Sequence, residues 1–408
     1  MSDISKKKRI LFLSALDFKE KSIQVIRKTP EYYASCGWDV DYIVARDNVK
    51  GGNYSYEKEI HPNGVNINRF YWPFLRIRAI NNRYLSLILS KLASFIVIFL
   101  LALKGYKKIK SCEYDIIYGY ELHGVLALAL LKPFLRKEKI VTRFQGTFIN
   151  EMLESKQWLR LIFNIDLLIA LKVKADLTIM TDDGTQGDKA LQRIRGLNNL
   201  GNIKFWTNGV DKIEHNTWPD LSKQKIKIVS ISRLVGWKRV DRCIKVVERL
   251  VANGFTNFEY EIIGGGELKD KLERMVNSLS LKNFVKFSGA LSHNEALSKL
   301  KESQIFFSMY DSSNVGNPLL EAIRANKIIV TLNNGDTGSW IKHDENGLIY
   351  NFTDNFFNQA AQDIQTLVCN KIKRENILKQ LSCTELNRLY TWDERLYKEE
   401  KEILNLFN

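Results

Sequence analysis

Short apolar runs alternate with helical patterns along nearly the whole chain, and this alternation constrains the fold more than any other feature. In the first half, runs rich in β-branched residues predict strands at 9–13, 40–44, 115–118, 139–142 and 177–180. After a polar segment at 213–220, the alternation restarts with predicted strands at 227–230, 260–263, 285–287, 305–307 and 328–331. Alternating strands and helices are typical of parallel, doubly wound sheets. Two such series separated by one break predict an α/β chain with two Rossmann-like domains.

The length of 408 residues agrees with two domains. We place the first domain at 1–215, the second at 216–390 and a C-terminal helix at 391–408. That last segment spaces Trp392, Leu396, Ile403 and Leu406 for one helical face. We expect the helix either to cap the second domain or to run back to the first.

Cysteine and histidine placement bears on the compartment and on metal binding. The 5 cysteines are odd in number, widely spaced and never arranged as CxxC, which argues against a disulfide framework or a zinc ribbon and fits a reducing cytoplasm. His61, His215, His293 and His343 show no metal-ligand spacing, so we expect neither a metal ion nor a cofactor.

The positive charge lies mainly in the first half of the chain. The formal net charge is +15, and residues 62–143 hold 14 basic but only 4 acidic side chains. The same stretch contains the most apolar part of the chain, 85–103, followed by the cluster Lys104, Lys107, Lys108 and Lys110. Basic and apolar residues together indicate an anionic membrane surface as partner. We expect no nucleic-acid partner, because aromatic and basic residues are not interleaved as in the known modules.

Two apolar stretches could be mistaken for membrane or export signals. Residues 84–103 are about long enough to span a bilayer, but Lys91 interrupts them and leaves a clean run of only 12 residues. A buried or interfacial helix is therefore favoured over a spanning one. The basic N-terminus followed by 10–16 resembles a signal peptide, but that run is short and meets Asp17, so a first strand is favoured.

Candidate ligand-binding residues lie in the turns after the predicted strands, where open α/β sheets bind their ligands. Arg233 and Lys238 follow one strand on a turn that contains Gly236 and leads into a helix. A guanidinium and an ammonium placed there can converge on a diphosphate. The alternative is a solvated helix start with surface charges.

Two further turns also follow directly after predicted strands. Gly264–Gly266 follows the strand at 260–263 and either lets backbone approach a ligand or makes a tight turn. The segment 313–317, after the strand at 305–307, supplies small and polar residues at a helix start, and Glu321 inside that helix could accept from a ribose diol. The glycines do not form GxGxxG, which argues against a nicotinamide-dependent oxidoreductase.

Several of these motifs agree in order and spacing, and together they resemble the family-4 glycosyltransferases of GT-B fold. The residues that carry the resemblance are Asn208-Gly209-Val210-Asp211, Ser232-Arg233-Leu234-Val235 with Lys238, Ile262 to Leu268, Val285 to Gly289, Leu320-Glu321-Ala322 and Glu345-Asn346-Gly347-Leu348. The motifs cover about 200–350, and the N-terminal half matches only by pattern. The resemblance implies two Rossmann-like domains facing across a cleft.

The resemblance also implies roles for particular residues. Arg233 and Lys238 would bind the donor diphosphate without a metal ion, and Glu321 would hold the ribose hydroxyls. Gly265, Gly266 and the backbone near Phe287 would frame the nucleotide. Backbone N–H groups of Asn314, Val315, Gly316 and Asn317 would face the sugar and phosphate.

The chain departs from the family pattern at three places. Ser313 stands where the first Glu of the E-x7-E motif is expected, so the contact to the sugar hydroxyls is altered, and Asp311 or Asn314 could replace it. The turn after the first strand has no glycine, and Lys19 or Lys21 could supply a phosphate contact there. Gln145 replaces the His of a common His-Gly pair, so it can hydrogen-bond but cannot carry a proton.

Two more residues are candidates for the cleft. His123 follows the strand at 115–118 and opens a helix, which makes a catalytic role and a structural role about equally expected. Asp182 follows the strand at 177–180 in the same way.

Together these features predict a retaining glycosyltransferase that uses a nucleotide-diphosphate sugar, with UDP-sugar favoured. The expected acceptor is a glycan or lipid-linked saccharide of bacterial surface polysaccharide synthesis, such as capsule or lipopolysaccharide. The expected location is cytoplasmic and peripheral on the inner face of the membrane. A nucleotide-sugar epimerase of the same fold and a non-catalytic nucleotide-sugar or glycan-binding subunit remain alternatives, the second because of Ser313.

Overall fold

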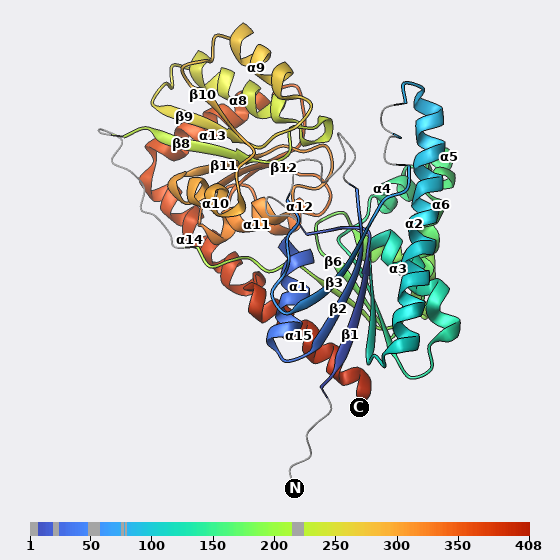
Figure 1. The fold of residues 1–408 in the computed structure, drawn as a ribbon. Helices are drawn as coiled ribbons and strands as arrows, with labels where there is room; N and C mark the ends of the chain where they lie inside the picture. Colours follow the sequence, from blue (N-terminus) through green and yellow to red (C-terminus); the bar gives the residue numbers. More distant parts are fainter. Residues whose placement is uncertain (1–6, 19–23, 48–57, 75–76, 78–79, 214–223) are drawn as a thin grey trace. The chain divides into compact units, whose positions relative to one another are not determined.

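The computed structural model describes residues 7–18, 24–47, 58–74, 77, 80–213 and 224–408, and the chain divides into two units (Figure 1). The first unit comprises Met1–Asp182, Gly187–Thr207 and Trp392–Asn408. The second comprises Asp183–Gln186 and Asn208–Thr391. The predicted boundary between 215 and 216 lies outside the described residues.

The first unit is built on a parallel sheet of seven strands in the order β3-β2-β1-β4-β5-β6-β7. The strands are β1 (Arg9–Ser14), β2 (Asp39–Arg46), β3 (Val65–Tyr71), β4 (Ile116–Tyr120), β5 (Lys139–Phe144), β6 (Leu177–Thr181) and β7 (Ile203–Trp206). Chain direction through the sheet reverses between β1 and β4, and that switch point is where open α/β sheets place their ligands. This is the Rossmann strand order.

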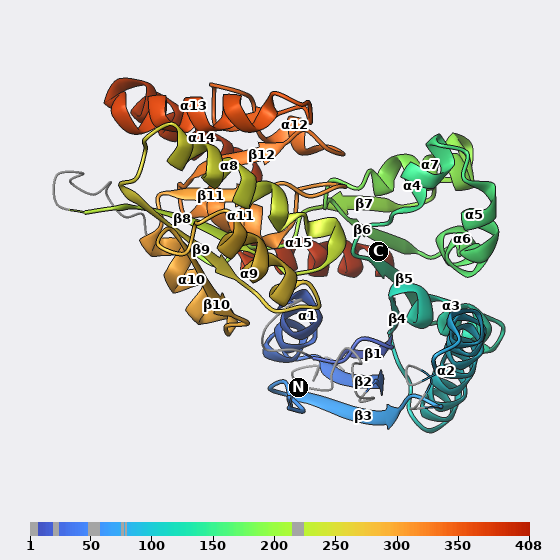
Figure 2. The same cartoon turned by 90° about the horizontal axis from the view of Figure 1, so that it is seen from above.

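Helices cover both faces of this sheet (Figure 2). They are α1 (Gln24–Ser35), α2 (Arg83–Ser111), α3 (Glu121–Leu131), α4 (Ile149–Glu154), α5 (Trp158–Phe163), α6 (Ile165–Lys172), α7 (Gly187–Arg195) and α15 (Trp392–Leu404). One core cluster joins the sheet to α1 and α15, and another joins it to α2 and α3. The apolar residues of the strands therefore contribute to two separate core layers, one on each face of the sheet.

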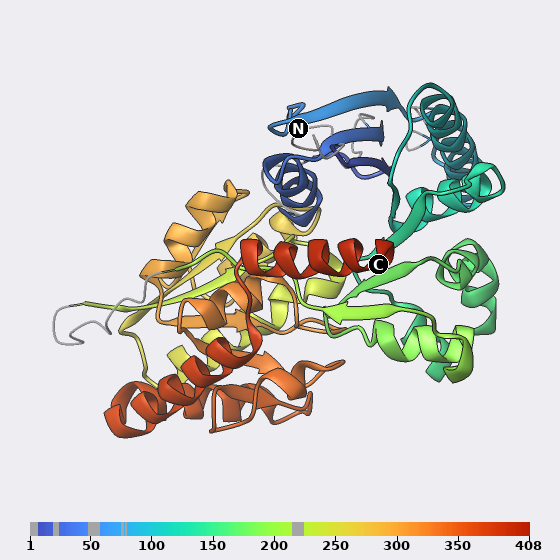
Figure 3. The same ribbon diagram turned by 90° about the horizontal axis from the view of Figure 1, so that it is seen from below.

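The C-terminal helix α15 belongs to the first unit although the whole second unit precedes it in sequence. Trp392, Leu396 and Ile403 are buried in the cluster that also contains strand residues such as Phe12 and Tyr118. Figure 3 shows α15 and α1, which contact each other, as the red and dark blue helices. Of the two predicted positions for this helix, the structure shows the one on the first domain.

The second unit repeats the same topology with six parallel strands in the order β10-β9-β8-β11-β12-β13. The strands are β8 (Ile226–Ile231), β9 (Phe258–Ile263), β10 (Val285–Gly289), β11 (Ile305–Ser308), β12 (Ile328–Leu332) and β13 (Leu348–Tyr350). The helices are α8 (Val240–Ala252), α9 (Lys269–Ser278), α10 (His293–Glu302), α11 (Asn317–Arg324), α12 (Thr337–Trp340), α13 (Phe356–Cys369) and α14 (Lys371–Arg388). Its switch point lies between β8 and β11.

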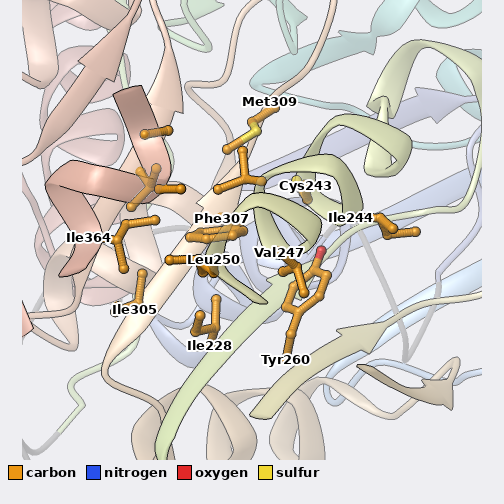
Figure 4. Close-up of a cluster of buried hydrophobic side chains, with 14 of the residues drawn as sticks. Ile228, Cys243, Ile244, Val247, Leu250, Tyr260, Ile305, Phe307, Met309 and Ile364 are labelled. Atoms are coloured by element: carbon orange, nitrogen blue, oxygen red, sulfur yellow. The ribbon is translucent and has the colours of Figure 1, made fainter. Parts of the chain in front are cut away.

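A large apolar cluster fixes α8 and α13 on one face of this second sheet. Figure 4 shows Ile228, Val247, Phe307 and Ile364 in that cluster, contributed by strands and helices that are distant in sequence. Because such a core is close-packed, it holds the ends of β8 and β11 in a fixed relation. Those two strand ends carry the candidate site.

The α/β prediction with two Rossmann-like domains is confirmed, while three short or polar strands were missed. β3 has the sequence VNINRFY, with polar residues at alternate positions and little burial. β7 and β13 have four and three residues and lie at the edges of their sheets. Runs of three or four residues are too short to show a period, and the polar residues of β3 weaken its apolar signal.

Helix α2 has the length and apolar composition of a membrane-crossing helix. One face of it nevertheless packs in the core of the first unit through Ala93, Val97 and Leu101, whereas Phe95 and Phe99 are exposed. The helix is therefore part of the sheet's cover, with a second apolar face that no described residue covers.

Candidate functional site

The strongest candidate site lies at the switch point of the second sheet, in the turns after β8 and β11. Arg233 is exposed two residues after β8, and Lys238 ends a short 3-10 helix at Gly236–Lys238 that precedes α8. The loop after β11 begins at Met309, and the N–H of Asp311 donates to the carbonyl of Trp237 at 2.9 Å. This bond holds the two turns side by side.

The glycines after β9 position the turn that carries Arg233. A Cβ on Gly264 would lie 1.8 Å from the carbonyl oxygen of Ser232, and one on Gly266 would lie 2.4 Å from that of Leu234. The N–H of Leu234 also donates to the carbonyl of Gly265 at 2.9 Å. Only glycine permits so close an approach of two backbones, so the glycine triplet packs directly against the turn that carries Arg233.

Lys238 lies between two aromatic rings, with its Nζ 3.5 Å from the ring centroid of Tyr310 and 3.9 Å from that of Trp237. Burial, together with the positive charge of Arg233 and against the carboxylate of Asp183, lowers the pKa of Lys238 to about 7. Two cationic side chains at one turn, with the ammonium partly desolvated, form a place where an anion would be stabilised.

Two arginines at the start of α8 hold the loop after β11. Arg239 pairs with Asp311 at 3.2 Å, and Arg242 pairs with the same carboxylate at 2.6 Å. Arg242 also donates to the carbonyl of Met309 at 3.1 Å. Asp311 is therefore engaged in an ion-pair network that fixes the loop.

Asn314 has a structural task as well. Its side chain accepts from the N–H of Tyr310 at 3.0 Å and donates to the carbonyl of Leu332 at 3.0 Å. Both side chains thus hold the loop itself, and the role of Asp311 or Asn314 in place of the missing glutamate stays a prediction.

The predicted row of available backbone N–H groups is shorter than expected. The N–H of Asn314 donates to Thr337 Oγ1 at 3.1 Å, and that of Val315 donates to Ser313 Oγ at 3.0 Å. These two N–H groups are satisfied within the loop, which corrects the prediction for them. Gly316 and Asn317, at the N-cap and first residue of α11, keep the position expected of an anion-binding helix start.

Ser313 is buried against a segment that arrives from the first half of the chain. Asp183–Gln186 follows β6 in sequence but belongs to the second unit by its contacts. A Cβ on Gly184 would lie 2.1 Å from Ser313 Oγ, and the carbonyl of Gly184 accepts from the N–H of Asp336 at 3.0 Å. The segment thus fills the space beside Ser313 that a longer side chain would need.

This packing leads to a prediction about Ser313. Replacing Ser313 with Glu should lower the free energy of unfolding by about 1–3 kcal/mol, because the larger side chain overpacks a filled site against Gly184. Ser313→Ala, which adds no volume, is the matched control and should stay within about 1 kcal/mol of the parent. Chemical denaturation of the three proteins measures this, and a Glu variant as stable as the parent would contradict it.

Glu321 lies in α11 beside His293, whose other ring nitrogen faces Asp211. His293 Nδ1 is 3.9 Å from Glu321 Oε1, and its Nε2 is 3.3 Å from Asp211 Oδ2. His293 occupies the first position of α10, behind the Ser292 cap. No role was predicted for this histidine, which shows no metal-ligand spacing; the Ser-x-x-Glu capping box would have placed it at a helix start.

The first-unit candidates lie at the ends of β4, β5 and β6. The N–H of Gln145 donates to Glu121 Oε1 at 2.5 Å, and its side-chain amide donates to the Tyr120 hydroxyl. Glu121 adopts a φ of 56°, an uncommon conformation for a residue with a side chain, and the sequence alone did not single it out. Asp182 donates its N–H to the carbonyl of Trp206 at 2.8 Å. Lys19 and Lys21 lie outside the described residues.

His123 packs beneath α2. Its Nε2 lies 2.7 Å from Ser94 Oγ on that helix, and its ring meets the Trp72 ring edge-on at 5.3 Å. Burial, with opposing influences from Asp166 and Lys91, lowers the pKa of His123 to about 4, so the ring is neutral at pH 7. These contacts favour the structural role of the two that were predicted, and the catalytic role stays a prediction.

In the described portion of the chain, no three His, Cys, Asp or Glu side chains are grouped as a metal ion would require.

Comparison with known proteins associates the second unit with a family. Residues 212–380 match the model of the family described as Glycosyl transferases group 1. A poly(ribitol-phosphate) alpha-N-acetylglucosaminyltransferase of Staphylococcus aureus is 27% identical over 203 residues, which cover 48% of this chain and 37% of that protein. The chain thus matches less than two fifths of that relative's length. The similarity to this family thus lies within the second unit.

Solved structures resemble the whole chain in fold. Sucrose-phosphate synthase from Thermosynechococcus elongatus aligns with a TM-score of 0.70 at 15% identity, over 98% of this chain and 99% of that one. HepE of Anabaena in complex with UDP-glucose aligns with a TM-score of 0.66 at 16% identity, over 98% and 99%. At such identities the likeness concerns the fold alone, which is GT-B.

Proposed function

We propose that the protein is a retaining glycosyltransferase that moves a sugar from a nucleotide-diphosphate sugar, with UDP-sugar as the favoured donor. The observation that carries the proposal is the pair Arg233 and Lys238, presented at the switch point of a group 1 glycosyltransferase domain. The acceptor is a glycan or lipid-linked saccharide of bacterial surface polysaccharide synthesis. The named activity of the staphylococcal relative and the UDP-glucose bound to HepE support this choice.

In the proposed reaction, the bond between the sugar C1 and the diphosphate breaks and a bond from C1 to an acceptor hydroxyl forms on the same face. The acceptor proton passes to the departing diphosphate oxygen. Arg233 and Lys238 stabilise the negative charge that develops on that diphosphate, an electrostatic role for which the proposal includes no metal ion. Glu321 accepts hydrogen bonds from the ribose, and His293 Nδ1 lies 3.9 Å from that carboxylate.

The pKa of Lys238 makes donor binding depend on pH. Below about pH 7 the ammonium is charged and attracts the diphosphate, and above it the free enzyme loses that charge. We therefore expect UDP affinity to fall by up to about tenfold per pH unit as the pH rises above 7. Calorimetric titration from neutral to alkaline pH measures this. Lys238→Arg, which stays charged, should abolish most of the slope, and a flat profile in the parent would contradict the assignment.

The test of the function combines binding and transfer. A thermal-shift screen of nucleotide sugars should give one donor class that raises the melting temperature, because binding to the native state stabilises it. That donor is then incubated with membrane lipid-linked saccharides, and transfer of radiolabelled sugar is followed with and without a chelator. Transfer without donor selectivity, or none with any acceptor, counts against the proposal.

The two alternatives give different outcomes in the same experiment. Turnover of the nucleotide sugar with no acceptor present indicates an epimerase. Tight donor binding with neither transfer nor turnover indicates a non-catalytic subunit, the reading that Ser313 in place of a glutamate favours.

We further propose that the protein works on the inner face of the cell membrane as a peripheral protein. The charge surplus in residues 62–143 and the expected lipid-linked acceptor support this location. Fractionation of the producing cell tests it: the protein should sediment with membranes and leave them, at least in part, when they are washed with alkaline buffer.

A further inference from the structure

Helix α2 presents an exposed apolar stripe on the side opposite its core face. The stripe consists of Ile88, Leu92, Phe95, Phe99 and Leu103, which follow one another at intervals of four, three, four and four residues. Ile88, Phe95 and Phe99 are 64%, 53% and 61% exposed. That spacing brings all five onto one side of a helix. The five residues therefore form one contiguous apolar patch, unlike apolar residues that are exposed singly.

Helices α5 and α6 extend this surface. Lys91 of α2 reaches Asp166 of α6 at 2.7 Å and lies 5.0 Å from the ring centroid of Phe163 in α5. Exposed apolar residues on these two helices are Trp158, Leu159, Ile162, Phe163, Ile165 and Ile169. We call the α2 stripe together with these six residues the apolar platform.

The ion pair between Lys91 and Asp166 neutralises the lysine that lies beside the platform. Lys91 is the sole charged residue from Tyr84 to Leu103, and both oxygens of Asp166 accept from its ammonium, at 2.9 and 2.7 Å. Asp166 is buried. A bidentate pair of this kind is what allows a lysine to lie among apolar side chains in a medium of low dielectric constant.

The positive charge beside the platform indicates which kind of partner would bind there. Helix α2 has six basic residues and no acidic one, and four of its lysines follow the stripe at its C-terminal end. A second copy of the chain would bring two basic helices together, and their like charges would repel each other. Anionic lipid headgroups would instead be attracted to these lysines.

We propose that the apolar platform inserts into one leaflet of an anionic lipid bilayer, with α2 lying in the plane of the interface. This inference deepens the proposed membrane location by naming the surface that enters the lipid, and it holds whatever sugar or acceptor the protein uses. In this proposal the inserted apolar side chains make the main contact with the membrane and the lysines a secondary one. Part of the positive charge is already neutralised, because Lys108 pairs with Asp41 at 3.0 Å. An in-plane helix keeps its buried face on the sheet, which a spanning helix could not.

The test is sedimentation of the full chain with vesicles of phosphatidylcholine, with and without phosphatidylglycerol. The double variant Phe95→Gln, Phe99→Gln should bind about tenfold or more weakly, since two exposed aromatic side chains no longer enter the lipid. The matched control Ile372→Gln, Leu386→Gln changes two residues that are 74% and 78% exposed in the second unit, and should bind as the parent does.

Salt and fluorescence separate insertion from its alternatives. At about 1 M salt, where charges are screened beyond about 3 Å, the parent should remain partly bound. Quenching of tryptophan fluorescence by brominated lipid should fall in Trp158→Phe. Complete release by salt, or equal binding of the Phe95/Phe99 variant, overturns the proposal. So does a parent that ignores vesicles but forms dimers that the same variant abolishes, because the platform would then join two copies.

Discussion

Replacing Arg233 or Lys238 with alanine is expected to lower kcat/KM for sugar transfer by about 10²- to 10³-fold each. Both side chains stand at the switch point of the second sheet, and both would stabilise charge that grows on the diphosphate as the sugar leaves. Steady-state kinetics with the donor identified by the thermal-shift screen measures the loss. We expect KM to rise, because the diphosphate of the bound donor is already charged, and kcat to fall, because that charge grows in the transition state.

Lys271→Ala and Arg274→Ala are matched controls for this prediction. They remove a lysine and an arginine from the exposed side of α9 in the same unit, so they change the net charge equally without touching the turns after β8 and β11. These controls should retain the parental rate. If Arg233→Ala or Lys238→Ala retains it too, the roles assigned to these residues are wrong.

Replacing Glu399 with glutamine is expected to destabilise the first unit by about 3–5 kcal/mol. Its carboxylate is fully buried in α15 and accepts from Arg143 of β5 and from Arg395 of α15, both at 3.0 Å, and from the Tyr118 hydroxyl at 2.9 Å. The amide leaves two buried guanidinium groups without a counter-charge. Denaturation followed by a probe in the first unit measures the change.

Glu402→Gln is the control, because it removes a carboxylate from the same helix at a partly exposed position. Glu402 pairs with Lys204 at 2.9 Å, and both side chains remain about 30% exposed, so the loss should stay below about 1 kcal/mol. Similar stability of the two variants would mean that the buried pair does not hold α15 on the sheet.

The candidate site was partly predictable because its main residues are local to one turn. Arg233 and Lys238 are five positions apart, so the turn after a strand brings them together whatever the rest of the chain does. The second ring around Lys238 was not predictable: Trp237 is adjacent in sequence, but Tyr310 comes from the loop after β11. That loop meets the first turn only because β8 and β11 are neighbours in the sheet.

Two of the N–H groups predicted to be available in 313–317 have partners within the loop, for a related reason. A run of small polar residues at a helix start indicates available N–H groups, but Thr337 and Ser313 itself accept from two of them. Thr337 is distant in sequence, and its position depends on where α12 packs. Local sequence indicates which groups need partners, and the tertiary structure determines which partner each one finds.

By itself, the sequence determined the two α/β series, most of the strands and the turns where ligands would bind. These properties follow from hydrophobic periodicity and turn chemistry over a few neighbouring residues. Only the tertiary structure decided that α15 returns to the first unit and that Asp183–Gln186 joins the second. It also decided that, among the described residues, one apolar face of α2 is exposed. Each of these depends on contacts between segments tens to hundreds of residues apart. An apolar residue has the same sequence signal whether another helix covers it or solvent does.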